Sequence, residues 1–565
     1  MGSFWTRFRA DALAALLPLA LWPLALWPLA LLLGATAGVA QASVPEIIRQ
    51  NVLAIEAGKA QRIDGQALQT QRSLGKLYAS NDFRPYWDSL RLQNLIEAIK
   101  DIEDDGLRPA DYHLEALQRL AKTARTDEQR AQLDLLASDA FALVLYHLYF
   151  GKVDPVSLDT HWNFDTRAIG QTDGVRFVHE AIRDNRIRGS VALARPTHWM
   201  YAAGREALAA HRAIAALGGW PSIASGPTLR VGMTDSRVAT LRRRLAISGD
   251  LAATSAVTGT DDFFDETLAA ALRHAQRRHR LAVDGALGPA TLRALNVPVE
   301  RRIAQLRVNL ERGRQVLHEI TEGNLVVVDI AGFEVHYIRD RQRIWQARAV
   351  VGQTYRETPV FKAKIDSLVF NPTWTVPPGI LQKDILPSLR RGDRSVLACK
   401  KLKVLDRDGR ELDPASIDFR GYTARNFPFT LRQAAGPDNA LGVVKIDFPN
   451  PHLVYLHDTQ SKSLFEETER TFSSGCIRTE RPLELAELLL ADPLRWSRAQ
   501  LEAAVASGGT QAIRLPKPVP VLLIYWTADR DDDGSIVFKP DPYGRDAREL
   551  AALDSPFRPG RRPPL

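Results

Sequence analysis

The chain has 565 residues, of which 45% are hydrophobic and 25% are charged, and its formal net charge is +8. This composition is that of a globular protein. The length excludes a single hydrophobic core, so we expect three or more domains. The chain has two cysteines, Cys399 and Cys476, which excludes a disulfide framework but leaves one bridge between them open.

The N-terminus has the three parts of a secretory signal: Arg7 and Arg9, an apolar run over residues 12–33, and small residues ending at Ala42. We expect cleavage after Ala42, with an uncleaved membrane anchor as the alternative. No second span is predicted, so the chain after the leader should lie outside the cytoplasm, in the periplasm. A basic protein there is expected to meet an acidic polymer or a membrane surface, and nucleic acid would be in the wrong compartment.

Residues 44–225 carry apolar side chains at helical spacing and predict an all-helical domain. One helix should end at Gly151, before a turn at Asp154 and Pro155. A Gly-Pro-Ser boundary then leads into residues 226–297, where Asp-Gly and Gly-Pro turns separate three short helices and Pro289 begins the last one. Residues 298–323 predict an amphipathic linker helix.

The periodicity changes to that of strands after residue 323, which predicts a mostly β domain over residues 324–517. Residues 378–440 interrupt these strands. A structureless loop of that length is unusual inside a compact domain, so we expect an ordered lid insertion over a groove. Residues 518–565 predict one further strand, a hairpin turn and a disordered tail.

The most informative stretch has a short apolar strand, Leu-Val-Tyr455-Leu-His457-Asp458, followed by Ser473-Ser-Gly-Cys476-Ile-Arg478. Side chains alternate across a strand, so Tyr455 and His457 should project from one face. A neutral imidazole in contact with the thiol could take its proton, and the ion pair would hold the thiolate below the ordinary pKa of about 8.5. The alternatives are a buried core cysteine and a structural histidine.

This joint pattern resembles the YkuD-type L,D-transpeptidases, cysteine enzymes of bacterial cell-wall cross-linking. Ser474 stands where the common form has histidine, which resembles the large YcbB-like branch. The segment Phe370-Asn-Pro-Thr-Trp374 is similar to the same branch, and residues 226–297 resemble a peptidoglycan-binding module. The resemblance implies a multidomain α+β fold: a helical scaffold domain, the three-helix module, and a mostly β YkuD-type sandwich with an inserted lid.

Site residues follow from the motif and the resemblance together. Cys476 is the expected nucleophile and His457 the proton donor and acceptor. Backbone N–H groups near Gly475 are the expected oxyanion donors, and a backbone carbonyl at Asp458 is expected to orient the imidazole. The expected substrate-binding residues are Tyr455, Trp374, Ser474 and Arg478. Arg478 is equally able to brace the loop. No cofactor is expected, and no metal, since no His-Glu-x-x-His helix occurs.

The resemblance also implies the activity: joining of peptidoglycan stem peptides by 3-3 cross-links through a cysteine thioester, in cell-wall biogenesis and the control of cell shape, with carbapenems as inhibitors of Cys476. Glycan and other wall-synthesis enzymes are expected partners. The sequence does not choose between cross-linking, D-amino-acid exchange and lipoprotein attachment. Two further readings stay open: a cysteine peptidase that only hydrolyses, and a non-catalytic wall-binding scaffold.

Overall fold

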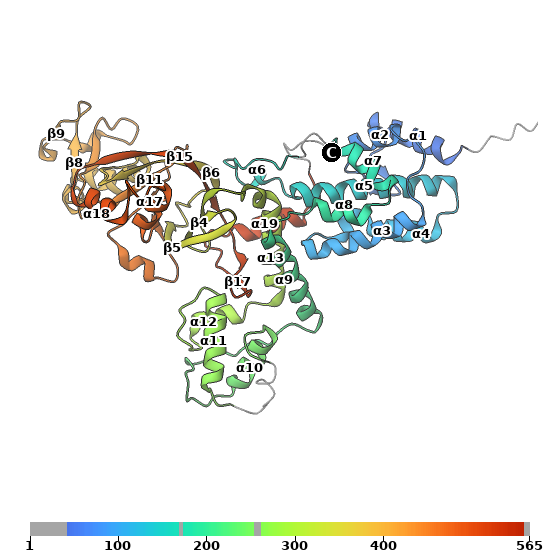
Figure 1. Ribbon diagram of the computed structural model, residues 1–565, viewed down its shortest axis with the longest axis horizontal. Coiled ribbons are helices and arrows are strands. Elements are labelled where there is room, and N and C mark those ends of the chain that lie inside the picture. The colour runs from blue at the N-terminus through green and yellow to red at the C-terminus, as the bar shows by residue number, and fades with distance from the viewer. Residues whose placement is uncertain (1–41, 169–172, 253–261, 559–565) are drawn as a thin grey trace, which may run out of the picture. The chain divides into compact units, whose positions relative to one another are not determined.

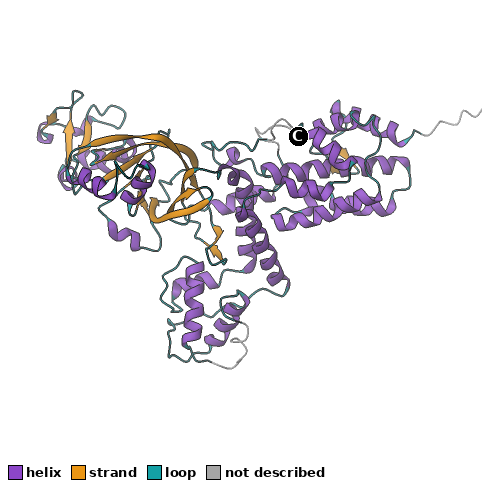
Figure 2. Ribbon diagram, viewed as in Figure 1, coloured by secondary structure: helices purple, strands orange, loops and turns teal. Residues whose placement is uncertain are grey.

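The computed structural model describes residues 42–168, 173–252 and 262–558. The predicted leader, apart from Ala42, lies outside the described residues, and so do residues 559–565 of the expected tail. Figure 2 shows the division that the periodicity predicts, with helices before residue 320 and strands mostly after it.

The first part of the chain is helical apart from one small ladder, β1 (Arg62–Ile63) with β2 (Gln66–Ala67). Its α-helices are α1 (Val44–Glu56), α2 (Gln71–Ala79), α3 (Ser89–Asp101), α4 (Leu114–Thr123), α5 (Asp127–Phe150), α6 (Pro155–Leu158), α7 (Gly174–Arg183), α8 (Ile187–Ala194) and α9 (Trp199–Ala216), with 3-10 turns η1 (Ile102–Asp105) and η2 (Pro109–Tyr112).

Helix α5 is the central element of this part. Thr126 and Gln129 form a capping box at its start, and Gly151, at a φ of +85°, follows its last residue. Among the described residues, α5 is the helix that is long and apolar enough to cross a membrane. Its side chains are mostly buried against neighbouring helices, as in a core helix (Figure 1).

The second part packs α10 (Arg237–Ile247), α11 (Glu266–Arg278) and α12 (Pro289–Leu295) around one small core. Pro289 is the first residue of α12, as predicted, where the missing N–H of proline costs no helical hydrogen bond. Arg244 is fully buried in this part. Its Nε donates to the Leu295 carbonyl at 2.9 Å, and its guanidinium lies 3.9 Å from the ring centre of Trp220.

The helix that follows, α13 (Val299–Val316), is more deeply packed than a linker. Beyond Arg307 both its apolar and its charged side chains are buried, and each charged group there has a partner. Arg314 and Glu311 pair at 2.6 Å with neither side chain exposed. Arg312 pairs with Asp546 at 2.7 Å and with Glu549 at 2.8 Å. The predicted amphipathic linker is therefore wrong in this half of the helix.

The third part is built on a nine-stranded sheet in the order β13-β5-β14-β12-β11-β6-β15-β3-β4. Because β4 also pairs with β5, all strands except β13 form a closed ring. The strands are β3 (Asn324–Asp329), β4 (Glu334–Arg339), β5 (Gln342–Gly352), β6 (Phe361–Phe370), β11 (Val444–Asp447), β12 (Leu456–His457), β13 (Thr471–Ser473), β14 (Ile477–Thr479) and β15 (Gln511–Ile524). Parallel pairs join β12 to β14, β13 to β5 and β15 to β3.

Helices α17 (Pro482–Leu490) and α18 (Arg498–Ala506) pack on this sheet (Figure 1). The long strand β15 crosses residue 517, where we placed the domain boundary, so that boundary is wrong. Its pairing with β6 is irregular between Arg514 and Val519, and Pro516 and Pro518 lie in this irregular part. A proline has no N–H to donate to a neighbouring strand, so it is tolerated where the pairing is irregular. In the sequence alone, the same prolines indicate the end of a strand.

The interruption between β6 and β11 is an ordered body with its own core. It begins at β7 (Trp374–Thr375), slightly before the predicted residue 378. A four-stranded sheet in the order β7-β10-β8-β9 is packed by short helices. Its remaining elements are α14 (Pro378–Ile380), η5 (Leu381–Ile385), α15 (Leu386–Arg390), α16 (Ser395–Cys399), β8 (Leu402–Leu405), β9 (Glu411–Leu412), η6 (Pro414–Ser416), η7 (Phe419–Gly421) and β10 (Thr430–Gln433). We call residues 374–433 the insertion.

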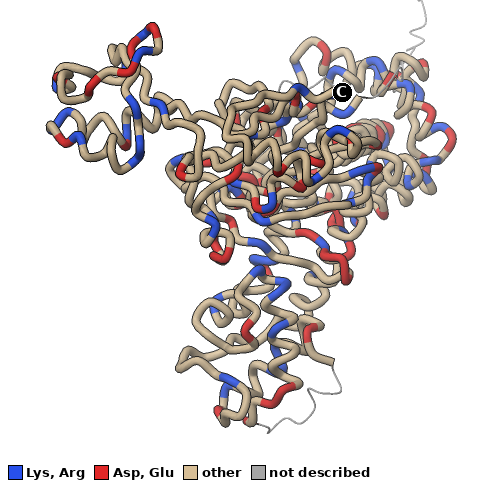
Figure 3. The backbone as a smooth tube through the Cα atoms, turned by 60° about the vertical axis from the view of Figure 1, so that its left-hand side comes forward, with Lys and Arg blue, Asp and Glu red and all other residues tan. Residues whose placement is uncertain are grey.

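The chain ends in β16 (Ala528–Arg530), β17 (Ile536–Phe538) and α19 (Arg545–Asp554), which the sequence did not predict as a helix. The 3-10 turns η4 (Leu317–Glu319) and η8 (Lys462–Glu466) complete the elements described. Figure 3 shows Lys and Arg interspersed with Asp and Glu along the chain, so the positive net charge is not gathered in one described element.

Candidate active site

Two neighbouring parallel strands carry the predicted site. Leu456 on β12 is opposite Ile477 on β14, and His457 is opposite Arg478. Leu456 and Ile477 are fully buried in the main core. Side chains alternate along a strand, so Tyr455, His457, Cys476 and Arg478 all belong to the other face. The register therefore brings together four residues that are separated by about twenty positions in sequence.

The imidazole of His457 is oriented by the backbone. Its Nδ1 hydrogen bonds to the carbonyl oxygen of Asp458. A carbonyl oxygen only accepts, so Nδ1 carries the proton and Nε2 keeps a lone pair for a further proton. Burial and the neighbouring Arg478 cation lower the pKa of His457 to about 3. The imidazole is therefore neutral over the physiological range.

The thiol of Cys476 is half-buried, and its Sγ lies 3.7 Å from the carbonyl oxygen of Leu453. Burial raises the pKa of Cys476 above its ordinary value, against the opposing effect of hydrogen bonding to Tyr455. The expectation of a pre-formed thiolate is thus wrong for this state: both groups are neutral. Among the described residues, no hydrogen bond joins Sγ to the imidazole of His457, although the two side chains share one face.

Tyr455 and Lys445 form the wall of this face. The ring of Tyr455 lies edge-on to His457, with centroids 5.6 Å apart. Lys445 on β11 is opposite His457, and its Nζ lies 4.5 Å from the ring centre of Tyr455. Burial, and then the charge of a Cys476 thiolate, raise the pKa of Tyr455. Lys445 also pairs with Asp447 at 2.7 Å.

Arg478 has neither an ion pair nor a side-chain hydrogen bond to any described residue. Burial lowers its pKa, and the nearby Cys476 opposes that shift. A guanidinium that is partly buried and unpaired favours an anion such as a carboxylate. The loop-bracing alternative for Arg478 has no hydrogen bond or ion pair to support it among the described residues.

The Cys476 loop, residues 473–476, is tightly held. Gly475 has a φ of +114°, a conformation that side chains rarely adopt. Its N–H donates to Ser473 Oγ at 3.1 Å, and Ser473 Oγ donates to the Cys476 carbonyl at 2.5 Å. The expectation for Gly475 is corrected here: its N–H is already bonded. Among the described residues none accepts from the N–H of Cys476, which leaves that group available to an oxyanion.

Ser474 and Trp374 connect the loop and the tyrosine to the insertion. Ser474 Oγ accepts from Arg356 Nη1 at 2.9 Å, and Arg356 forms a bidentate pair with Asp384 of η5, at 2.7 and 2.6 Å. Trp374 packs against the core of the insertion, and its indole reaches the hydroxyl of Tyr455. Cys399 is exposed on α16, and both cysteines are free.

Asp458 also supports the site through its carboxylate. Asp458 Oδ2 accepts from the N–H of Val443 at 3.0 Å, and Oδ1 accepts from Lys462. The neighbouring Gly442 has no room for a side chain, since a Cβ would lie 2.2 Å from Asp458 Oδ2.

Sequence reasoning missed four residues around the site: Lys445, Asp447, Arg356 and Thr358. The first two had a signal. In the segment Val444-Lys-Ile-Asp-Phe448 polar and apolar residues alternate, which indicates a strand with one polar face. Arg356 and Thr358 lie in a loop without a recognisable pattern.

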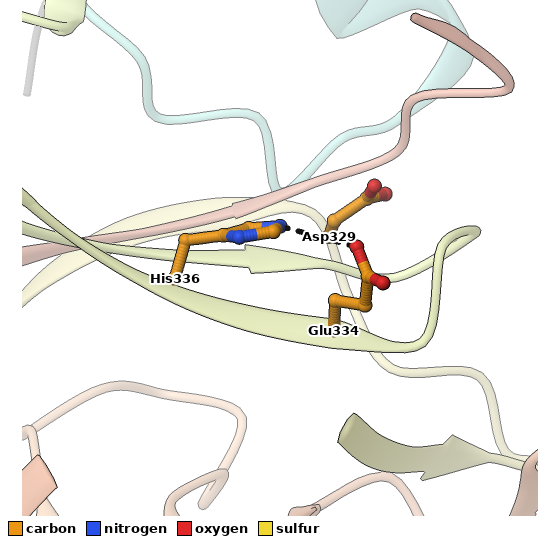
Figure 4. A group of neighbouring side chains, drawn as sticks. All are labelled: Asp329, Glu334 and His336. Carbon is orange, nitrogen blue, oxygen red and sulfur yellow. Dashed lines mark ion pairs between the residues drawn. The ribbon is translucent and has the colours of Figure 1, made fainter. Parts of the chain in front are cut away.

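A separate group of possible metal ligands lies on β3 and β4, where Asp329, Glu334 and His336 are close together (Figure 4). The ammonium of Lys539 pairs with Asp329 at 2.5 Å, and Arg280 lies 3.7 Å from Glu334. His336 Nε2 lies 3.5 Å from Glu334. The carboxylates are thus neutralised by cations of the chain itself, and the group is an ion-pair cluster rather than a coordination site.

Comparison with known proteins matches three segments to family models. Residues 323–513 match the L,D-transpeptidase catalytic domain (YkuD), residues 234–295 the "Putative peptidoglycan binding domain", and residues 72–208 the "Scaffold domain". Residues 323–513 are therefore a YkuD-type L,D-transpeptidase catalytic domain. The chain joins this domain to a peptidoglycan-binding domain and a scaffold domain, which confirms the fold class predicted from sequence.

A curated relative, "Putative L,D-transpeptidase" from Haemophilus influenzae, is 36% identical over 248 residues. The match covers 44% of this chain and 49% of the relative, so the chain spans about half of the relative's length. Two solved L,D-transpeptidases are each 14% identical and match 53% of this chain. The one from Stackebrandtia nassauensis is covered to 97% with a TM-score of 0.21, and that from Xylanimonas cellulosilytica to 99% with 0.15. TM-scores this low bear on neither fold nor activity.

Proposed function

We propose that this protein is a peptidoglycan L,D-transpeptidase that forms 3-3 cross-links between stem peptides through a thioester on Cys476. The observation that carries the proposal is the register of β12 and β14, which puts Cys476, His457, Tyr455 and Arg478 on one face of a catalytic domain of this family. The match to a peptidoglycan-binding domain supports the same substrate.

The reaction begins with the thiol as a neutral group. A stem carboxylate pairs with Arg478 and brings the scissile carbonyl to Sγ. As the S–C bond forms, the thiol proton passes to Nε2 of His457, and the oxyanion takes the N–H of Cys476. The C–N bond then breaks, the leaving D-amino acid takes the proton from His457, and the thioester remains.

Resolution of the thioester repeats these steps in reverse. The side-chain amine of a second stem attacks the thioester carbonyl and gives its proton to His457, and the proton returns to sulfur as the C–S bond breaks. The cleaved peptide bond supplies the acyl group, so the transfer needs no ATP. Such an enzyme would work at the cell wall, in the periplasm, after export by the predicted leader.

A product assay tests the proposal. The protein without residues 1–42 is incubated with purified tetrapeptide-containing wall fragments, and the products are weighed by mass spectrometry. Cross-linked dimers are the expected result. If only tripeptides form, the protein is a peptidase that hydrolyses the stem. If the substrate is unchanged, the protein is a non-catalytic scaffold that binds the wall.

The nucleophile has its own test. Cys476→Ala should abolish dimer formation and labelling by a carbapenem, because it removes the sulfur that forms the thioester. Cys399→Ser is the matched control, since Cys399 is the other free cysteine and lies on the insertion. Residual dimers from Cys476→Ala would refute the assignment.

A further inference from the structure

The Cys476 loop is held by Thr358, and Thr358 is held in turn by Tyr543, which lies outside the segment matched to the catalytic family, residues 323–513. Thr358, which is fully buried, donates from Oγ1 to the carbonyl oxygen of Gly475 at 2.9 Å. The same Oγ1 accepts from the N–H of Gly352 at 2.9 Å. Thr358 therefore joins the loop to the end of β5.

Tyr543 in turn holds both ends of this turn. Its hydroxyl donates to the carbonyl of Gly352 at 2.7 Å and accepts from the N–H of Thr358 at 3.2 Å. The turn is compact, because a Cβ on Gly352 would lie 2.1 Å from the carbonyl oxygen of Arg356. Tyr543 is itself fixed: its ring stacks on Tyr525, whose hydroxyl accepts from the N–H of Tyr543 at 3.0 Å.

The planarity of the peptide bond transmits this constraint to the reacting centre. The carbonyl of Gly475 and the N–H of Cys476 belong to one peptide unit and point in opposite directions. Fixing the carbonyl with Thr358 therefore fixes the direction of the N–H, which is the donor left available in this loop. Gly475 has a φ of +114°, a conformation that glycine adopts more readily than other residues.

We infer that Tyr543, acting through Thr358, is a positioning residue that aims the Cys476 N–H at the oxyanion of the reaction. The inference rests on the proposed function insofar as Cys476 is the nucleophile. It adds that the segment after residue 513 supports the oxyanion site, so the family-matched segment alone should be acylated more slowly than the whole chain.

Two reagents distinguish a misdirected Cys476 N–H from an unfolded Cys476 loop. Acylation of Cys476 by p-nitrophenyl acetate forms an S–C bond and a tetrahedral oxyanion. The thiol proton goes to His457, and nitrophenolate leaves as the ester C–O bond breaks. Alkylation by iodoacetamide displaces iodide from carbon and forms no oxyanion. Both are measured on the whole chain in a Cys399→Ser background, so that each reagent reports Cys476.

We expect Tyr543→Phe and Thr358→Val to slow acylation about 10- to 100-fold, the scale of a weakened oxyanion donor, while alkylation stays within about 2-fold. Thr358→Ser keeps the hydroxyl and should recover most of the rate. Tyr337→Phe is the matched control. It removes a buried hydroxyl bond to a backbone carbonyl, that of Leu488 at 3.2 Å, in the same domain but away from the loop.

If the variants lose acylation and alkylation equally, the Cys476 loop is unfolded in them. If acylation is unchanged in both variants, the peptide unit between Gly475 and Cys476 does not need the support of Thr358 and Tyr543. Either result overturns the inference. Failure of the proposed function looks different: the parent protein would be acylated by the ester and respond to these variants, yet form no cross-linked dimers from wall fragments.

Discussion

The insertion and the C-terminal segment, residues 525–554, both reach the Cys476 loop, but with different chemistry. The insertion is connected through Arg356, whose partner Asp384 is exposed and whose bond to Ser474 lies at the surface. The C-terminal segment is connected through the buried hydroxyls of Thr358 and Tyr543. Exposed ion pairs contribute at most about 1 kcal/mol and are screened by salt, whereas buried polar groups are costly to leave unpaired.

The difference teaches which neighbour of the loop can move. The insertion has its own hydrophobic core, so it can shift as a body while that core stays intact. The C-terminal segment has no such independence: Arg312 of α13 ties it down through Asp546 and Glu549. The insertion can therefore shift relative to the Cys476 loop, whereas the C-terminal segment is fixed in place beside it.

The largest effect, on stability, should come from breaking the ion pairs that fix the C-terminal segment. Arg312→Met leaves the buried Glu549 and the partly buried Asp546 without their cation, and burial already raises the pKa of Glu549 to about 7. We expect the free energy of unfolding to fall by about 3–5 kcal/mol, measured by urea denaturation. Arg356→Met is the matched comparison and should cost about 1 kcal/mol or less. Similar losses in the two variants would remove the distinction between the two regions.

A second effect, on the pH dependence of the transfer rate, concerns His457 and Arg478, which lie on the strands between the two regions. The Arg478 cation lowers the pKa of His457, so His457 remains an effective base in acid. In Arg478→Gln the pKa of His457 should rise, and the acid limb of the transfer rate should move to higher pH. Lys445→Gln should move it in the same direction but less, because Arg478 is the stronger of the two influences. An unmoved acid limb in Arg478→Gln would show that His457 does not set it.

The smallest effect should come from releasing the insertion. Asp384→Asn removes the charge that pairs with Arg356, and we expect KM for wall fragments to change about 2- to 5-fold with kcat nearly constant. Raising the salt from about 0.05 to about 0.5 M should mimic this change in the parent protein and have little effect in the variant. Asp408→Asn, on an exposed turn of the same insertion, is the control. A large loss of kcat in Asp384→Asn would show that the insertion, like the C-terminal segment, must stay fixed for catalysis.

Much of the fold was predictable because periodicity reports burial. The change of period near residue 323, the helix end at Gly151 and the start of α12 at Pro289 are local features, and the structure has each of them. The motif also predicted a strand that carries His457, and the structure ends β12 at His457, with Cys476 directly before the neighbouring strand β14. These successes come from patterns that a short window of sequence contains.

The failures involve contacts between distant segments. The buried charges of α13 look solvent-exposed in sequence because their partners, such as Asp546, lie more than two hundred positions away. The prolines of β15 look like a strand end because the irregular pairing that tolerates them is invisible. The neutral state of Cys476 depends on burial by the folded sheet, which the motif does not encode.

The attachment of Tyr543 also bears on the order in which the molecule is assembled. A polypeptide is synthesised from its N-terminus, so the thiol and the imidazole are made before the tyrosine that steadies them. A nascent chain that stops before Tyr543 would hold the reactive cysteine on a turn without this support. Late completion of this kind would keep the reactive cysteine slow to acylate until Tyr543 has been made.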